Sequence, residues 1–324
     1  MATPIGVAEE RDISLDEEAL KKVRVSFRCG YNTRDAIIYA LGIGCDAQRY
    51  VNELDTRFAV FPTYPLALFH KGEAAEVQSF PQPSVKRFLQ ATRTLGLPMI
   101  DAEVDIQTLA ALPTGGGTFV MSTALVGASQ KGPGVIFRER TEMRDARNQA
   151  LVCRIESAFF CLGAKLATPT IGPRPPQPPR APDRPADRRV SETIPVDRAL
   201  LYRLSGDYNQ IHASAPAARA AGLDGPILHG RCTLGMSVRA VLAEYADGDP
   251  RAFRGCRCRF VAPVSMGDTL VTSMWRERAG APVVFEAEAI NADGERRVVL
   301  RHACVELAGA PTPTAGTRAG ASKL

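Results

Sequence analysis

A proline-rich stretch near the middle of the 324-residue chain sets the strongest limit on its fold. It runs from Gly172 to Asp187 and reads Gly-Pro-Arg-Pro-Pro-Gln-Pro-Pro-Arg-Ala-Pro-Asp-Arg-Pro-Ala-Asp. Proline fixes one backbone torsion and has no N–H to donate, so this composition favours an extended polyproline II segment that cannot pack into a core. We therefore expect a spacer between two parts of the chain, each long enough to bury a core of its own.

The second half of the chain predicts one helix followed by strands. Residues 229–246 give the clearest helical pattern, because apolar side chains recur on one face. These side chains are Leu234, Val238, Val241, Leu242 and Tyr245. Apolar runs separated by turn residues then predict strands at 256–264, 269–276, 283–290 and 297–306. A long helix followed by antiparallel strands indicates a sheet that wraps around the helix.

The first half is a fainter version of the same plan. We expect a helix at 36–42 with Thr33 as its N-cap, and a marginal helix at 85–95. Strands are expected at 117–129, 134–143 and 150–162. Two α+β pseudo-repeats, each a sheet around a helix, fit this pattern. The expected division is a lead-in (1–24), an N-terminal repeat (25–171), a linker (172–190), a C-terminal repeat (191–308) and a tail (309–324).

Composition argues against several classes of protein. The chain is 45% hydrophobic and 23% charged with a net charge of +5, and its basic residues form no long run with interleaved aromatics, so nucleic acid is not expected as a partner. The eight cysteines show no CxxC spacing, which argues against a metal site or a disulfide scaffold, and Cys256 and Cys258 fit alternation along a strand. Residues 1–10 do not resemble a secretory signal, and no apolar run is long enough to span a bilayer.

The last three residues carry a targeting signal. Ser322, Lys323 and Leu324 form the tripeptide that the peroxisomal import receptor reads at a C-terminus. A Gly-, Pro- and Thr-rich tail precedes them and would leave the tripeptide accessible. We therefore expect the import receptor as a partner and the peroxisome as the location.

The stretch from Tyr202 to His212 holds the chemistry-bearing residues. Asp207 and His212 are five positions apart, and this spacing would turn them away from each other on an α-helix. They must therefore lie on a loop to converge. Asn209 between them can hold a water molecule while the acid and the imidazole transfer protons. The same residue types also occur in capping and turn motifs, and composition alone does not decide between the two interpretations.

The predicted helix that follows begins at a candidate oxyanion site. The first amides of a helix have no partner within it, and the helix dipole favours negative charge there. Gly230 is small enough to let a ligand approach its N–H, which makes it a candidate oxyanion donor. The simpler interpretation is that Gly230 is only a turn residue. For His229 we expect at most a structural role, as a satisfied histidine at the helix end. His70, in a loop-like region, and His302, within a strand, are interpreted as ordinary.

These segments together resemble the hydratase 2 motif. Residues 202–212, then Ala-Gly-Leu-Asp-Gly-Pro-Ile-Leu-His-Gly at 221–230 and Cys-Thr-Leu-Gly at 232–235, are similar to the (3R)-specific 2-enoyl-CoA hydratases and the MaoC-like dehydratases. The similarity continues through 259–264 and 268–275, and Thr33–Gly44 resembles the N-terminal segment of the family. On this basis the resemblance covers roughly residues 25–308.

The resemblance implies a double hot-dog fold and a reaction. The C-terminal repeat would carry catalysis, and the N-terminal repeat would shape the acyl pocket. Asp207 and His212 would form the catalytic dyad, Asn209 would help to hold the water, and Gly230 would supply the oxyanion N–H. The implied reaction is hydration of trans-2-enoyl-CoA to (3R)-3-hydroxyacyl-CoA in peroxisomal fatty-acid β-oxidation, by a hydro-lyase that needs no cofactor or metal. A homodimer is expected from the family.

The chain departs from the family pattern in places. The His-Gly-Glu-Gln segment of the family reads Asp101-Ala-Glu-Val104 here, which keeps only Glu103 as a candidate substrate contact. Tyr202 is a second candidate substrate contact. Arg231 follows the oxyanion glycine where a neutral residue is common, and we expect it to face solvent rather than pair with a CoA phosphate. Gln210 stands where proline is usual.

Two other functions compete with hydration. The first is a MaoC-like dehydratase that acts on another acyl thioester, with the same fold and dyad. The second is a non-catalytic hot-dog protein that binds acyl-CoA, which the altered segment at Asp101–Val104 favours and the intact Asp207, Asn209 and His212 set opposes.

Overall fold

A continuous antiparallel sheet organises the chain. The structure is a computed structural model that describes residues 11–13, 16–173 and 177–308. Its main sheet has 11 strands, with β2, β4, β5, β6 and β3 in one half and β10, β13, β12, β11 and β9 in the other. The N-terminal half comprises β2 (Arg24–Tyr31), β3 (Met99–Thr108), β4 (Gly117–Lys131), β5 (Gly134–Asp145), β6 (Leu151–Leu162) and the short β8 (Thr170–Ile171). The C-terminal half comprises β9 (Arg188–Thr193), β10 (Phe253–Phe260), β11 (Thr269–Trp275), β12 (Val283–Ile290) and β13 (Arg296–Leu307).

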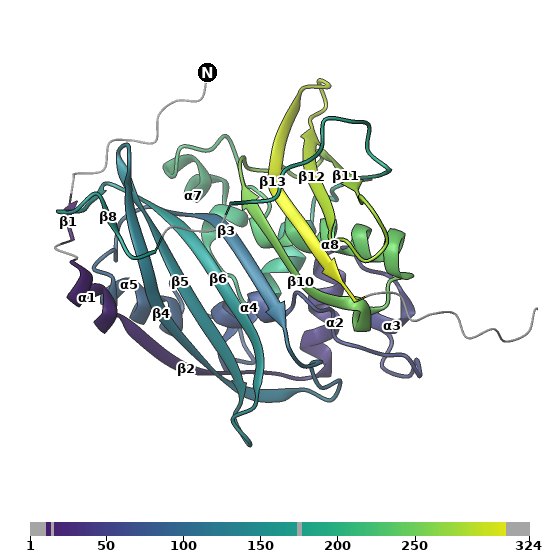
Figure 1. The fold of residues 1–324 in the computed structure, drawn as a ribbon, viewed down its shortest axis with the longest axis horizontal. Coiled ribbons are helices and arrows are strands. Elements are labelled where there is room, and N and C mark those ends of the chain that lie inside the picture. Colours follow the sequence, from purple (N-terminus) through teal and green to yellow (C-terminus); the bar gives the residue numbers. More distant parts are fainter. Residues whose placement is uncertain (1–10, 14–15, 174–176, 309–324) are drawn as a thin grey trace, which may run out of the picture.

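Helices cover the inner face of both halves, while the two halves lie side by side (Figure 1). The helices of the described residues are α1 (Glu17–Lys22), α2 (Thr33–Gly42), α3 (Gln48–Val51), α4 (Pro65–Lys71), α5 (Pro83–Ala91), α6 (Arg198–Tyr202), α7 (Ala215–Ala220) and α8 (Gly230–Ala246). Short 3₁₀ turns span Arg203–Ser205, Gln210–His212 and Pro250–Ala252. A small parallel pair, β1 (Arg11–Asp12) and β7 (Ala164–Lys165), lies beside the main sheet.

Strands β3 and β10 join the two halves. They pair antiparallel from Gln107 opposite Gly255 to Glu103 opposite Arg259. Each half is therefore a sheet with a helix on its inner face, and the edge of one sheet continues into the other (Figure 1). This confirms the expected α+β class and the double hot-dog arrangement. The division into repeats by residue number stays a prediction.

Helix α8 is the central helix of the C-terminal half. Its residues from Cys232 to Val238 are all buried, and the helix packs against β10, β11 and β13. Gly235 allows a close approach to the N-terminal half, because a Cβ atom there would lie 2.5 Å from Cγ2 of Ile43. The same helix thus packs on its own sheet and on the end of α2, which fixes the position of its N-terminus relative to both halves.

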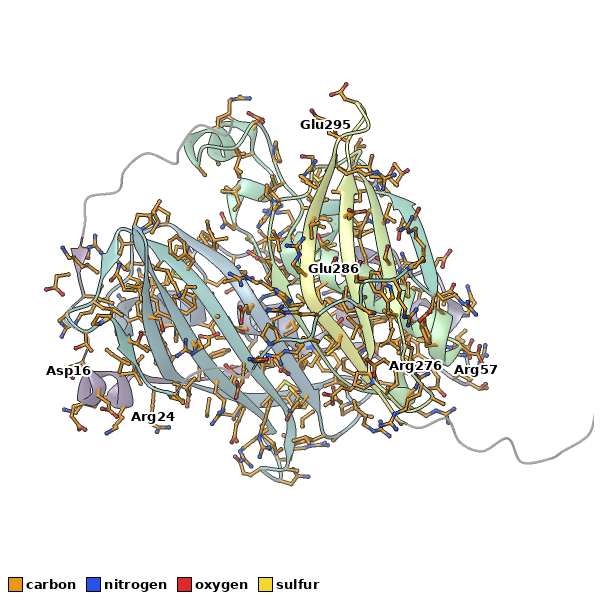
Figure 2. All side chains as sticks on the ribbon, turned by 45° about the horizontal axis from the view of Figure 1, so that its top comes forward. Asp16, Arg24, Arg57, Arg276, Glu286 and Glu295 are labelled. Carbon is orange, nitrogen blue, oxygen red and sulfur yellow. The ribbon has the colours of Figure 1, made fainter. Side chains whose placement is uncertain are left out.

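Two hydrophobic clusters make up the core. The larger one includes the inner faces of both halves and most of α8. The smaller one lies in the N-terminal half, around Phe88, Phe137 and Phe159. Charged side chains such as Arg24, Arg57, Arg276, Glu286 and Glu295 project from the outer surface (Figure 2). In the described part of the chain, no helix has the length and apolar character to cross a membrane.

The proline-rich linker follows the C-terminal sheet where it is described. The carbonyl oxygen of Pro179 accepts a hydrogen bond from Nδ1 of His302 (3.0 Å), and the carbonyl oxygen of Arg184 accepts one from Nε1 of Trp275 (2.9 Å). Asp187 accepts a third bond from the Arg276 N–H. Residues 177–187 are therefore held to this sheet by two backbone carbonyls and by Asp187, whose carboxylate accepts from Arg276 and whose N–H donates to the Met274 carbonyl.

Several local predictions need correction. Asn32, and not Thr33, caps α2, because its side chain accepts from the Asp35 N–H while the Asp35 carboxylate accepts from the Asn32 N–H. Strands β2, β3 and β9 were not predicted. The expected polar lead-in contains α1, whose Leu20 is buried in the smaller cluster. The predicted strands at 117–162 and 256–306 and the helix at 229–246 are confirmed within a few residues.

Candidate active site

A glycine turn presents the acidic residue of the site. Helix α6 runs into the 3₁₀ turn Arg203–Ser205, and Gly206 then adopts a φ of +127° that only glycine adopts readily. A Cβ atom at Gly206 would lie 2.6 Å from the backbone of Lys71. The buried Gln82 side chain donates a hydrogen bond to the Gly206 carbonyl. The turn is therefore fixed against the N-terminal half, directly before Asp207.

Asp207, Asn209 and His212 share one short loop. Asp207 Oδ1 accepts from the Asn209 N–H (3.2 Å), and Asn209 Oδ1 accepts from the Ile211 N–H (3.3 Å), which caps the 3₁₀ turn Gln210–His212. Ligand atoms of Asp207, His212 and His229 all lie within 4.8 Å of one another. The acid and the imidazole thus converge on a loop, as their spacing requires. Among the described residues, nothing bonds to the Asn209 side-chain NH₂, so it can donate to a bound molecule.

The protonation of His212 follows from its surroundings. The side chain is 8% exposed, and burial lowers its pKa from 6.5, against the opposing effect of Asp207. A neutral ring carries one proton, and the Ile227 carbonyl can only accept, so Nδ1 holds that proton and donates it over 2.9 Å. Nε2 is therefore the basic nitrogen. A neutral histidine with a fixed tautomer and a free Nε2 is suited to take a proton from water.

His229 forms the floor of the site. Its ring stacks on that of His212 with 3.6 Å between centroids and 24° between planes. Nε2 of His229 donates to the Asp207 carbonyl (3.2 Å), while its buried Nδ1 has no partner in the described structure. Burial and then His212 lower the pKa of His229 to about 3. The expectation of a satisfied helix-end histidine is thus only half right, because His229 packs directly on the candidate base.

Asp207 is ionised at neutral pH. Burial opposes its ionisation, yet the imidazoles around it and the Asn209 N–H hold the pKa of the carboxyl well below its usual range. One fixed negative charge therefore lies beside the neutral His212 ring. This charge can stabilise an imidazolium that forms when His212 accepts a proton.

His70 is a site residue that the sequence interpretation missed. It lies near the end of α4, in the N-terminal half, and burial lowers its pKa while Asp207 acts in the opposite direction. Its Nδ1 is buried without a partner among the described residues. No motif surrounds His70 in the sequence, so only the packing of α4 against the Asp207 loop could reveal it.

The N-terminus of α8 provides a free amide. His229 is the N-cap and makes no side-chain cap bond, and its carbonyl accepts from the N–H groups of Cys232 and Thr233. Within the described residues, the N–H of Gly230 has no acceptor. A Cβ atom at Gly230 would lie 3.1 Å from the ring of Phe260. Glycine thus lets the Phe260 ring approach this turn closely, and its free amide lies at the positive end of a helix, where an oxyanion would be stabilised.

Arg231 does not face solvent, contrary to expectation. Its side chain is 12% exposed, and its Nε lies 3.0 Å from Oδ2 of Asp101 on β3. Its Nη1 donates to the Leu66 carbonyl (2.8 Å) at α4. The guanidinium therefore extends from the first turn of α8 into the N-terminal half. Both partners of this ion pair are departures from the family pattern, and the structure shows that they occur together.

Two other candidate residues have different surroundings from the dyad. Glu103 lies opposite Arg259 with 3.9 Å between charged atoms, and both side chains are about half exposed, at 45% and 51%. Its neighbour Val104 is buried, so Glu103 faces the outer side of the sheet and does not reach the dyad. Tyr202 is buried with its ring 4.9 Å from that of His229, and therefore supports the floor of the site.

The predicted targeting residues Ser322, Lys323 and Leu324 lie outside the described residues.

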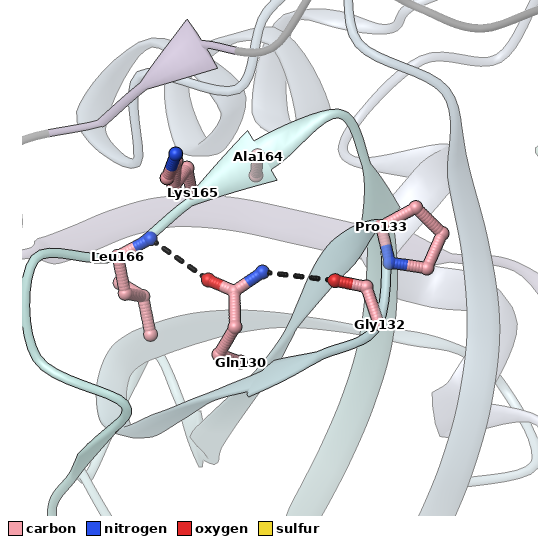
Figure 3. Close-up of a pocket in the computed structure, with 6 residues that line it drawn as sticks. All are labelled: Gln130, Gly132, Pro133, Ala164, Lys165 and Leu166. Atoms are coloured by element: carbon pink, nitrogen blue, oxygen red, sulfur yellow. Dashed lines mark hydrogen bonds between the residues drawn. The ribbon is translucent and has the colours of Figure 1, made fainter.

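A surface hollow lies away from the candidate site. It is lined by Gln130, Gly132, Pro133 and Ala164–Leu166 and contains none of the site residues (Figure 3). The Gln130 side chain spans it, accepting from the Leu166 N–H and donating to the Gly132 carbonyl (Figure 3).

The ligand atoms of Asp207, His212 and His229 lie close enough together to hold a metal ion, but their geometry suits proton transfer better. His212 Nδ1 and His229 Nε2 both bond to carbonyls. The lone pairs of His212 Nε2 and His229 Nδ1 lie in nearly parallel ring planes, because the two rings stack with 24° between them. A metal ion needs ligand lone pairs that converge at about 2 Å from each nitrogen. We therefore interpret the cluster as an acid–base site.

Glu139 is a buried carboxyl that the sequence interpretation also missed. It lies on β5, faces inward and is 6% exposed. Burial raises its pKa from 4.5 to about 7, with Arg231 lowering it and Asp101 raising it. In the described structure no hydrogen-bond or ion-pair partner accompanies it.

This raised pKa predicts a pH-dependent stability. Native protein holds the Glu139 proton more tightly than the unfolded chain, so the destabilisation by Glu139 is absent below about pH 4.5 and complete above about pH 7. The Glu139→Gln variant has no such titration. Its free energy of unfolding relative to wild type should therefore increase by about 2.5 kcal/mol between pH 5 and pH 8, measured by urea unfolding. A difference that does not change with pH would contradict the raised pKa.

Comparison with known proteins places this site in a family. A family model described as the MaoC-like domain matches residues 177–290, and the N-terminal domain of MFE-2 hydratase 2 matches residues 29–163. The peroxisomal multifunctional enzyme type 2 of Drosophila melanogaster is 33% identical over 86% of this chain, which spans only 46% of that enzyme. The peroxisomal enoyl-CoA hydratase 2 of Arabidopsis thaliana is 30% identical, over 81% of this chain and 86% of the relative.

Solved structures agree with this placement. A MaoC-like dehydratase from Phytophthora capsici superposes with a TM-score of 0.82 at 28% identity, over 91% of this chain and 99% of that one. The matched length includes both halves of the sheet. The similarity therefore extends over the whole double repeat and beyond the motif around Asp207.

Proposed function

This chain belongs to the hydratase 2 and MaoC-like family of hydro-lyases, and from that premise we propose that it adds water to trans-2-enoyl-CoA to form (3R)-3-hydroxyacyl-CoA. The observation that carries the proposal is the state of His212. Its Nδ1–H is held by the Ile227 carbonyl, its ring is neutral, and its Nε2 is free beside the ionised Asp207. Hydration of an activated double bond needs such a base next to an oxyanion site.

The residues can be assigned steps that balance. His212 Nε2 takes one proton from water as the hydroxide oxygen bonds to C3, and the C2–C3 π electrons move onto the thioester oxygen. The Gly230 N–H stabilises this enolate. The proton on His212 then passes to C2, which restores the carbonyl and completes syn addition of one water. Asp207 stabilises the imidazolium, and the Asn209 amide orients the water.

The cellular setting is part of the proposal. The C-terminal Ser-Lys-Leu tripeptide and the peroxisomal names of relatives support import into the peroxisome and a role in fatty-acid β-oxidation. Recognition by the import receptor is proposed on the same basis, whereas a homodimer is proposed only from membership of the family. The binding of acyl-CoA follows from the proposed reaction.

Two alternatives make different predictions. The first alternative is a dehydratase of another acyl thioester, which would share the dyad, and the Phytophthora capsici structure is named a MaoC-like dehydratase. It should act on an acyl-carrier-protein thioester better than on the CoA ester. A non-catalytic acyl-CoA-binding protein should bind enoyl-CoA without turnover, which the free Nε2 of His212 argues against.

The acidic side of the pH–rate profile tests the role of His212. The base must be neutral, and burial lowers its pKa below 6.5, so kcat/KM should be constant near pH 7.5 and fall only below pH 6.5. The measurement is kcat/KM with trans-2-decenoyl-CoA between pH 4.5 and 8. The Glu139→Gln variant should show the same midpoint of kcat/KM against pH. An unchanged midpoint would assign the profile to His212 and not to the titration of Glu139. A wild-type midpoint above pH 7 would exclude a buried neutral His212 as the base.

The proposal itself is tested by incubating the protein with trans-2-decenoyl-CoA and following the loss of enoyl absorbance. We expect rapid hydration and a 3-hydroxydecanoyl-CoA product. Tight binding without loss of absorbance would favour the non-catalytic alternative. Turnover of the acyl-carrier-protein thioester alone would favour the dehydratase.

A further inference from the structure

The inner face of the N-terminal sheet is interrupted by a polar band. The band consists of Thr123 on β4, Thr141 and Glu139 on β5, and Ser157 on β6. All of these side chains are buried, with exposed fractions between 2% and 7%. Thr123 pairs with Thr141 across the strands, and Glu139 pairs with Ser157. The two pairs are offset by two residues along β5, so the band crosses the three strands as two neighbouring rows.

This band separates the two hydrophobic clusters. On β4, Met121 belongs to the larger cluster and Leu125 to the smaller one, with Thr123 between them. On β5, Met143 and Phe137 flank the band in the same way. A fold that needed only a packed core would gain free energy from apolar side chains at these positions. The regular interruption indicates a polar function.

Glu139 is the ionisable member of the band, and no described side chain forms a hydrogen bond or an ion pair with its carboxyl group. The hydroxyls of Thr123 and Thr141 bond to each other at 2.7 Å. The nearby guanidinium of Arg231 is engaged by Asp101 and by the Leu66 carbonyl. Glu139 is thus left as an inward-facing carboxyl that no described residue complements. A buried polar group without a partner costs about 1–3 kcal/mol, so a ligand that bonds to it would be favoured.

Glu139 lies within electrostatic range of Arg231, the residue that follows the candidate oxyanion amide. Arg231 directly follows Gly230, whose N–H would hold the thioester oxygen, and its side chain extends to Asp101 on β3. Arg231 and Asp101 also influence the pKa of Glu139, which places the carboxyl within range of their charges. A substrate bound through Gly230 would therefore direct its acyl chain into the N-terminal half, toward Glu139.

We propose that the preferred substrate is an enoyl-CoA whose acyl chain carries a hydroxyl group, and that Glu139 determines this specificity by binding the hydroxyl. The inference rests on the proposed function and specifies its substrate class. A hydroxyl is both a donor and an acceptor, so it can bond to the carboxyl in either protonation state. A plain alkyl chain would leave Glu139 buried and unpaired. A site that bonds to a hydroxyl rejects the analogue without it more strongly than an apolar pocket can.

The test compares chains with and without the hydroxyl. The probes are trans-2-decenoyl-CoA and the set of its analogues with one hydroxyl at each carbon from C6 to C10. We expect wild type to prefer at least one hydroxylated chain by about 10- to 100-fold in kcat/KM. Glu139→Met should lose that preference and gain activity on the plain chain. Glu139→Gln, which keeps hydrogen-bonding capacity, should retain part of the preference.

A matched control lies on the outer face of the same sheet. Glu156 on β6 pairs with Arg140 and is about half exposed, so Glu156→Met should leave the preference unchanged. Hydration of the plain chain with equal or higher kcat/KM than every analogue would overturn the inference, and so would a preference that persists in Glu139→Met. No hydration of any chain by wild type would instead refute the proposed function. If Glu139→Met fails to fold, the substrate preference of wild type and its partial loss in Glu139→Gln still test the inference.

Discussion

Replacing His212 with alanine should lower kcat for enoyl-CoA hydration by about 10³- to 10⁴-fold while the protein remains folded. The expected loss is large because His212 is the only group whose basic nitrogen is both free and held in a fixed tautomer, among the described residues of the loop. Asp207→Asn should have an effect of similar size, since it removes the charge that stabilises the imidazolium and keeps the shape of the side chain. KM should change less than kcat in both variants.

Controls separate catalysis from folding. His302→Ala removes a side chain whose one hydrogen bond to the described residues is to the Pro179 carbonyl on the linker. Its kcat should stay within about twofold of wild type, an effect within the usual scatter of surface changes. Near-native circular dichroism and thermal unfolding should accompany each inactive variant. If either Asp207→Asn or His212→Ala retains more than about a tenth of the wild-type kcat, well above the loss that general acid–base catalysis explains, the dyad assignment is wrong.

Replacing Gly206 with alanine should damage both stability and turnover. The new Cβ atom would lie 2.6 Å from the Lys71 backbone, and the φ of +127° is unfavourable for any other residue. Strain and overpacking together should lower the free energy of unfolding by about 2–4 kcal/mol. Because the turn directly precedes Asp207, relaxation of the clash would displace the carboxylate. A displacement of about 1 Å can reduce kcat by about 100-fold.

The matched control is Gly225→Ala. Gly225 lies in the segment that leads to α8, and a Cβ atom there would meet nothing within 4 Å. This variant should be as stable and as active as wild type. The measurements are urea unfolding and kcat with trans-2-decenoyl-CoA. Equal effects of the two substitutions would show that the Gly206 turn does not position the site.

The fold could be predicted where its pattern is local. The C-terminal strands and α8 have regular apolar spacing, and turn residues separate them, so their positions follow from the sequence alone. Strand β3 was missed because its polar residues dominate: Glu103 and Asp105 face the outer side, and their partners Arg259 and Arg257 lie on β10. That pairing joins the two repeats, and no periodicity within β3 indicates it.

The site divides in the same way. Asp207, Asn209, His212 and Gly230 lie within one stretch of sequence, so a motif could identify them. The groups that surround them come from the other repeat. The partner of Arg231 is Asp101, 130 positions earlier in the chain, and His70 approaches from α4. A charged residue next to an oxyanion glycine is expected to face solvent unless its distant partner is known.

The stereochemistry of the product tests the central claim most directly. Wild-type protein is incubated with trans-2-decenoyl-CoA, and the 3-hydroxydecanoyl-CoA formed is separated on a chiral phase against both standards. The family predicts the (3R) product alone, and its rate of formation should fall by about 10³- to 10⁴-fold in Asp207→Asn and His212→Ala. A (3S) product, or a racemic one, would contradict the account.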